Sequence, residues 1–278
     1  MTGSARGRTG EYGYGERVPL VAAAVCPHPP LIVPELAGAA APELDDLRAA
    51  ADAAVAGLYA SGARTVVVVG AGDRTAEPSH PFRGSFTPWG LPLEVELGGS
   101  PDGDTDGGHP GLGADRPPGD RAGGDALPLS LLVGAWLLRR TPPDRPTTWR
   151  MAGVAADAPT GECAAEGARL SSGSAPQPWA LLVMGDGSAC RGPKSPGYDD
   201  PRAEAYDEGV ARALADADAD ALLGLDPVLS GQLRVAGRAA WQVLAGAVRA
   251  AGGDWRGELS HFSAPYGVAY FVAKWVRA

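Results

Sequence analysis

The sequence predicts an α/β fold: a single domain with a central mixed, largely parallel sheet flanked by helices. Two observations lead to this prediction. Continuous apolar runs at 18–25 and 179–184 are typical of strands buried on both faces. Residues 18–69 also show the order strand, helix, strand, which is the βαβ pattern of a parallel pair with a right-handed crossover. The length of 278 residues fits one large domain.

The first unit begins with a strand over Val18–Val25, which ends at the prolines that follow it because proline has no donor for the ladder. A helix is expected over Pro42–Ser61. Pro42 suits the first turn, the acidic residues after it complement the helix dipole, and Gly62 ends the helix. A second buried strand, Arg64–Val69, contains four consecutive valines.

The later elements follow the same patterns. Leu91–Leu97 alternates apolar and charged residues, which predicts a half-exposed strand near a sheet edge. Asp-Pro pairs at 200–201 and 226–227 are typical of helix starts. The other expected elements are helices over Leu127–Arg140, Arg202–Ala215, Val228–Val235 and Ala239–Ala251, and strands over Met151–Ala156, Trp179–Met184, Gly257–Phe262 and Val268–Trp275.

Two segments have too little apolar character to fold. Residues 1–17 contain no apolar run, so we expect a flexible N-terminal tail and not a secretory signal. Residues 100–126 are rich in Gly, Pro and Asp, and burial there cannot offset the entropy of ordering the chain. They are predicted to form a disordered insertion within the domain 18–278.

Composition and charge exclude several classes of protein. Lys plus Arg number 24 against 33 Asp plus Glu, and the net charge of −9 argues against a nucleic-acid binder and a membrane-surface protein. The apolar stretches are far shorter than the roughly 20 residues of a membrane span. The cysteines, Cys26, Cys163 and Cys190, lack the number and spacing of a disulfide framework or a zinc ribbon, so a cytoplasmic protein is expected.

Polar residues follow the predicted strands, at the sheet edge where α/β proteins bind ligands. His28 lies between prolines that fix its backbone, which suits a metal ligand or a general base; the alternative is a hydrogen-bonded loop histidine. Asp73 follows Gly-Ala-Gly and has the chemistry to bind a metal or a substrate hydroxyl, although a turn residue is the favoured interpretation. His80 lies farther along the same loop, where an exposed histidine is the commoner outcome.

The loop Gly185–Arg191 holds several functional side chains, namely Asp186, Ser188, Cys190 and Arg191. Its backbone amides are placed to hold an anion, and Arg191 next to Cys190 predicts a lowered thiol pKa. The alternative is a tight turn with a buried thiol. A nucleophile pair of Cys190 or Cys26 with His28 has no local sequence signature to support it.

Two features near the C-terminus complete the set of candidates. Glu258 and His261 are three residues apart in a predicted strand, so they are expected to point to opposite faces and not to form a ligand pair without a bulge. Tyr266 lies in the turn between the last two strands, where its hydroxyl is placed to reach the pocket. The alternative for Tyr266 is a packing aromatic.

Three segments together resemble the class III extradiol ring-cleavage dioxygenase superfamily. They are residues 25–35 around Cys-Pro-His-Pro-Pro, residues 185–189 (Gly-Asp-Gly-Ser-Ala) and residues 264–268 (Ala-Pro-Tyr-Gly-Val). The likeness is to the compact actinobacterial branch related to the catalytic chain of protocatechuate 4,5-dioxygenase and to Memo-type proteins. It implies an α/β domain of the same kind, in which two histidines and one glutamate hold Fe(II) for a catecholate and O₂, with a further histidine as acid/base.

The family's site residues match this chain in part. His28 matches the first metal histidine, and Asp73 or His80 would have to replace the second. Residues 189–191 are Ala-Cys-Arg where the acid/base histidine is expected, and residues 238–240 are Arg-Ala-Ala near the expected metal glutamate. The metal site is therefore incomplete in the sequence.

Three hypotheses follow. The first is an Fe(II)-dependent ring-cleavage dioxygenase, the second a pseudoenzyme that binds a small aromatic ligand or a protein partner with no cofactor, and the third a metal-free hydrolase or transferase using Cys190 or Cys26. A homo-oligomer is compatible with each. The residues assigned to the first hypothesis are, for the metal, His28, Asp73 and His80, and, for catalysis, Asp186, Ser188 and Tyr266.

Overall fold

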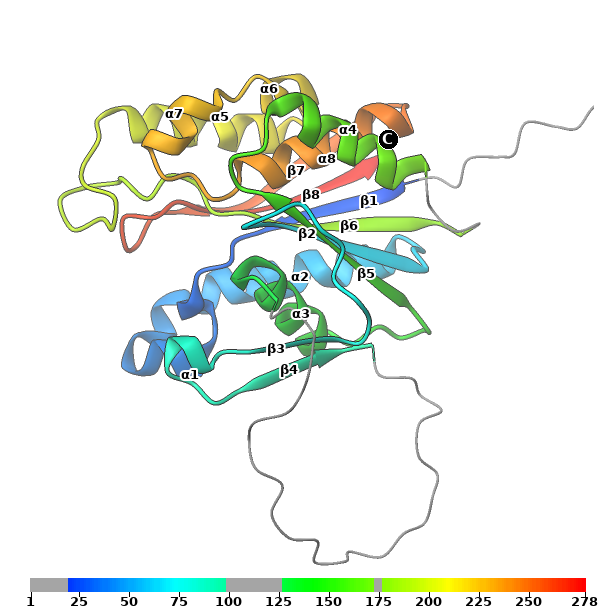
Figure 1. The fold of residues 1–278 in the computed structure, drawn as a ribbon, viewed down its shortest axis with the longest axis horizontal. Helices are drawn as coiled ribbons and strands as arrows, with labels where there is room; N and C mark the ends of the chain where they lie inside the picture. Colours follow the sequence, from blue (N-terminus) through cyan, green and yellow to red (C-terminus); the bar gives the residue numbers. More distant parts are fainter. Residues whose placement is uncertain (1–19, 99–126, 173–176) are drawn as a thin grey trace, which may run out of the picture.

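The computed structural model describes residues 20–98, 127–172 and 177–278. The predicted tail, residues 1–17, and the predicted insertion, residues 100–126, lie outside these ranges. Within them the chain has the predicted α/β architecture, with a mixed, mostly parallel sheet between helices (Figure 1). No helix of the described ranges is long and apolar enough to cross a membrane.

Six strands form the main sheet, in the order β5-β2-β6-β1-β8-β7. The strands β5, β2, β6 and β1 run parallel, whereas β8 is antiparallel to β1 and β7 is antiparallel to β8. The inner strands are buried nearly throughout, as expected when helices cover both faces. The bounds are Leu20–Cys26 (β1), Thr65–Gly72 (β2), Thr148–Ala155 (β5), Trp179–Met184 (β6), Trp255–Ser263 (β7) and Tyr270–Arg277 (β8).

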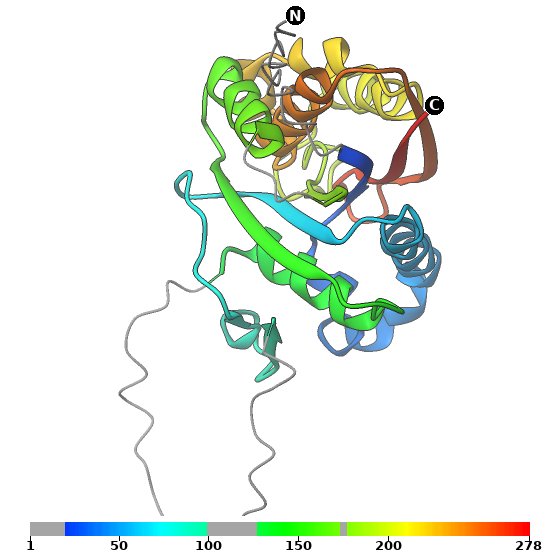
Figure 2. The ribbon, with the colours of Figure 1, turned by 90° about the vertical axis from the view of Figure 1, so that its right-hand side faces the viewer.

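Helices enclose the sheet in two layers (Figure 2). On one face, α2 (Asp45–Ala60) and α3 (Leu129–Arg140) share a hydrophobic core with the strands, and the short α1 (Pro34–Ala37) precedes them. The remaining helices, which lie on the opposite face, are Thr160–Ser172 (α4), Arg202–Ala215 (α5), Ala219–Leu223 (α6), Pro227–Gln232 (α7) and Arg238–Ala251 (α8). All of them but α7 contribute to a separate hydrophobic core there.

The connectivity differs from the predicted βαβ pair. β1 and β2 are parallel but not adjacent, because β6 lies between them and pairs with both. The strand predicted over Leu91–Leu97 does not belong to the main sheet. Its observed part, β4 (Glu94–Leu97), pairs with β3 (Phe82–Ser85) in a separate sheet that contacts α3. The helix predicted over Pro42–Ser61 begins as a 3₁₀ turn at Gly38–Leu44 and continues as α2.

The sequence pattern does not predict α4, because small residues line its contact with α8 and leave no wide apolar stripe. The two helices lie side by side (Figure 2). A Cβ on Gly167 would overlap the backbone of Val243 and Ala247, and a Cβ on Gly246 would overlap the backbone of Ala164. Glycine at both positions therefore sets the distance between α4 and α8.

We expect Gly167→Ala to lower the free energy of unfolding by about 2 kcal/mol, because the added methyl group forces two backbones apart. Gly161→Ala in the first turn of the same helix is the matched control, since its Cβ would meet nothing within 4 Å. That control should be neutral or gain up to about 0.5 kcal/mol. Urea denaturation of both variants measures the difference; equal stability would show that α4 and α8 are not in close contact.

Candidate functional site

The candidate site lies at the edge of the sheet where β1 and β6 end and β8 begins, toward the left of Figure 1. The prolines after Cys26 stop β1. The loop after β6 continues alongside its neighbours: the Gly185 N–H donates to the Cys26 carbonyl at 2.9 Å, and the Gly187 N–H donates to the chain just before β8 at 2.8 Å. These bonds hold Asp186 next to His28.

His28 and Asp186 form a nearly enclosed pair. The backbone N–H of His28 donates to Asp186 Oδ1 at 2.7 Å, and His28 Nδ1 lies 3.7 Å from the same oxygen. The two side chains are 9% and 12% exposed. Nδ1 itself is buried and has no hydrogen-bond partner within the described ranges. A buried polar atom without a partner costs about 1–3 kcal/mol, so the placement of Nδ1 opposes stability.

Burial controls the ionisation of this pair and of a neighbouring tyrosine. Burial raises the pKa of Asp186 above the ordinary aspartate value, and His28 lowers it in part. Burial also raises the pKa of Tyr270, and the charge of Asp186 raises it further, so the phenol stays protonated. The sequence analysis missed Tyr270. Its signal is a tyrosine that begins the apolar run 270–273, since a buried phenol needs a polar neighbour.

Of the other predicted site residues, Asp73 and His80 lie away from this pair. Asp73 is exposed, directly after β2. His80 is exposed, and its ring lies edge-on to Phe82 with the centroids 5.3 Å apart, near the start of β3. Tyr266 is at the rim of the site, where its hydroxyl donates to Glu43 Oε2 at 2.9 Å.

The donor set does not fit the iron site that the resemblance implies. In the described part of the chain, no group of three or more His, Cys, Asp or Glu side chains could hold a metal ion. The resemblance places a metal glutamate near residues 238–240. Arg238 lies there instead, and it donates to the carbonyl oxygens of Ala156 at 2.7 Å and Ala158 at 2.5 Å. One histidine and one carboxylate are fewer ligands than a facial triad needs. Fe(II) stays a prediction from the resemblance.

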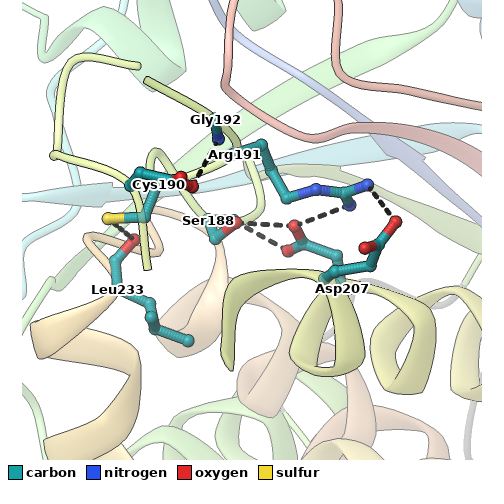
Figure 3. A network of polar contacts seen from close by, with 8 residues as sticks. Ser188, Cys190, Arg191, Gly192, Asp207 and Leu233 are labelled. Atoms are coloured by element: carbon teal, nitrogen blue, oxygen red, sulfur yellow. Dashed lines mark hydrogen bonds and ion pairs between the residues drawn. The ribbon is translucent and has the colours of Figure 1, made fainter. Parts of the chain in front are cut away.

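A second buried carboxylate holds the rest of the loop after β6 (Figure 3). Asp207 of α5 is fully buried and accepts the Ser188 N–H at 2.9 Å and the Ser188 hydroxyl at 2.6 Å. Arg191 lies 3.4 Å from the same carboxylate and pairs with Glu204 at 3.0 Å. Burial raises the pKa of Asp207, and these contacts lower it in part. Ser188 is also fully buried, so it anchors the loop.

The three cysteines are buried with free thiols. The prediction of a lowered pKa for the Cys190 thiol is wrong. Arg191 turns to Asp207 (Figure 3), and burial raises the pKa of Cys190. The Cys190 thiol donates to two backbone carbonyls at 3.2 and 3.4 Å. Burial raises the pKa of Cys26 to about 12. Neither thiol is poised as a thiolate, so the thiol-based hydrolase hypothesis has no support from this geometry.

A β-bulge in the edge strand overturns the expectation for Glu258 and His261. The β7–β8 register shifts between Leu259 and His261, so Ser260 is an extra residue in β7. The extra residue changes the alternation of side chains, and Glu258 and His261 both face α2 instead of opposite sides. His261 Nε2 then lies 2.7 Å from Ser263 Oγ.

Comparisons with known proteins support the fold alone. No protein-family model matches the sequence, and neither does any curated protein. Among solved structures, the chain is similar to the uncharacterized protein JW3007 from Escherichia coli K12, with a TM-score of 0.50 and 12% identity over 92% of this chain and 99% of that chain. The predicted α/β fold with its mostly parallel, helix-flanked sheet is confirmed. The resemblance to extradiol dioxygenases stays a prediction.

We expect Asp186→Asn to be more stable than the wild type at neutral pH. Above the ordinary pKa of aspartate the unfolded chain has lost the proton that the folded chain retains, so wild-type stability falls as pH rises through the raised pKa of Asp186. Asparagine does not ionise, so it removes this loss of stability, and its side-chain oxygen can still accept a hydrogen bond from the His28 N–H. Urea denaturation from about pH 4 to about pH 8 should show a growing advantage for the variant. A constant difference would contradict the prediction.

We expect Asp207→Ala to lower the free energy of unfolding by about 3 kcal/mol, because it leaves buried donors of Ser188 and Arg191 without an acceptor. Glu208→Ala, the next residue of α5, is the control. Its side chain is 55% exposed, and its ion pair with Arg212 is long, at 4.0 Å. The free energy of unfolding should therefore change by no more than about 0.5 kcal/mol. Similar losses in thermal denaturation of the two variants would contradict the assignment of Asp207 as an anchor.

Proposed function

We propose that this chain is a metal-free relative of the class III extradiol dioxygenases that binds a small hydroxylated aromatic molecule at the His28–Asp186 pair. The enclosed contact between His28 Nδ1 and Asp186 Oδ1, at 3.7 Å and without a hydrogen-bond partner for Nδ1 in the described ranges, carries the proposal. Natural proteins retain such unfavourable polar groups at functional sites. The resemblance supplies the aromatic class of the ligand.

The chemistry of the pair suits recognition of a hydroxyl group. Asp186 faces Nδ1 of His28, which favours the proton on that nitrogen and leaves Nε2 as an acceptor. Tyr270 is protonated and close enough for its pKa to respond to Asp186, so it supplies a donor nearby. A phenolic ligand would donate to the imidazole and accept from the phenol, and its ring would shield the pair from water.

Ring cleavage with Fe(II) is the second candidate. The contact between His28 and a carboxylate favours it, because metal-bound histidines are commonly oriented in this way. It needs two further ligands, and the described residues do not bring three together. Only this second candidate requires iron and consumes O₂, so the two proposals differ in a direct test.

The test is titration of the metal-free protein, in the presence of a chelator, with catechol by ligand-observed NMR. For a ligand this small we expect a Kd of about 0.1–1 mM. His28→Gln should weaken binding about tenfold, since it removes the imidazole acceptor. His80→Gln is the matched control, because His80 is exposed near the start of β3, and it should leave the Kd unchanged.

Two outcomes would overturn the proposal. An equal Kd for the wild type and His28→Gln would show that the ligand does not bind at this pair. Catechol consumption with uptake of O₂ after Fe(II) is added, lost in His28→Gln, would establish the dioxygenase instead.

A further inference from the structure

A second polar pair lies at the end of β7, separate from His28 and Asp186. His261 and Ser263 are two residues apart beyond the bulge, so both side chains point to the α2 side of the sheet. His261 Nε2 lies 2.7 Å from Ser263 Oγ, and both residues are partly exposed. A hydroxyl in contact with an imidazole and open to solvent is the starting arrangement of a nucleophile with its base.

The charges around His261 suit a base. Burial, the larger effect, lowers the pKa of His261 below the ordinary histidine value, and the charge of Asp46 in the first turn of α2 raises it in part. Glu258 and Lys274, which share this face of the sheet, pair with each other at 3.1 Å. The imidazole is therefore neutral near pH 7 and able to accept a proton, while Asp46 stabilises the imidazolium that results.

We propose that Ser263 is a nucleophile and His261 its general base, in acyl transfer from small activated esters. Ser263 Oγ attacks the ester carbonyl carbon as its proton passes to His261 Nε2. The carbonyl–oxygen bond of the ester then breaks, and the imidazolium returns the proton to the departing oxygen. Water hydrolyses the acyl-serine with His261 again accepting a proton, so serine and histidine are regenerated.

This pair is a neighbour of the proposed ligand site but does not depend on it. Ser263 is opposite Tyr270 in the β7–β8 register, so the two side chains share a face. Neither His28 nor Asp186 takes part in the acyl transfer. Failure of the aromatic-ligand proposal would therefore leave the serine proposal intact, and the reverse is also true.

The test is covalent labelling of the full chain with a fluorophosphonate probe, followed by mass spectrometry of the peptides. A bond forms between Ser263 Oγ and phosphorus, fluoride leaves, and the hydroxyl proton goes to His261. We expect the label on Ser263, no label there in Ser263→Ala, and labelling about 100-fold slower in His261→Gln because the base is missing. Ser260→Ala is the matched control, since Ser260 lies on the same strand and its hydroxyl bonds to the Val272 carbonyl.

A further variant separates catalysis from a structural role. Asp46→Asn should shift the pH midpoint of labelling to lower pH, because the imidazolium loses the carboxylate that favours it, while Glu258 and Lys274 stay paired. No label on Ser263, or an undiminished rate in a folded His261→Gln with wild-type circular dichroism, would overturn the proposal.

Discussion

The close approach of the end of β6 to the start of α8 determines where the site residues lie. A Cβ on Gly185 would be 2.6 Å from Gly237 Cα and 2.7 Å from Trp241 Nε1, so the strand can reach the helix only with glycine there. The Gly237 N–H then donates to the Asp186 carbonyl at 2.8 Å. The backbone around Asp186 is thus bonded to both α8 and β1, and its side chain lies against His28.

Two buried carboxylates of this region show how a structural group differs from a functional one. Asp207 accepts two hydrogen bonds from Ser188 and lies beside Arg191, so its burial is compensated. Asp186 accepts only the His28 backbone N–H among the bonds described, and its imidazole neighbour is too distant for a hydrogen bond. The loop after β6 is thus anchored by the satisfied carboxylate of Asp207 on α5, and it carries the under-satisfied carboxylate of Asp186 at the sheet edge, where a ligand can supply what is missing.

Local patterns predict the elements well, and the site only in part. The apolar runs of β1 and β6 predict buried strands, and with them the position of His28 at a strand end, because burial on both faces leaves a local signature. The placement of β6 between β1 and β2, and the arrival of Tyr270 on an antiparallel strand, result from pairing between distant segments. α4 is not predicted because Gly167 serves a close helix contact that hydrophobic periodicity does not measure.

The bulge at Ser260 brings two apolar side chains of β7 to one face of the sheet. Leu259 packs into the core beneath α5 and α8, and Phe262 stacks on Phe271 of that core with the ring centroids 5.0 Å apart. Leu259 and Phe262 are three positions apart, so an unbroken strand would place them on opposite faces of the sheet. One extra residue lets both face the same core, and His261 moves to the α2 side instead of entering that core as an unpaired imidazole. The apolar residues of β7 therefore place its polar ones.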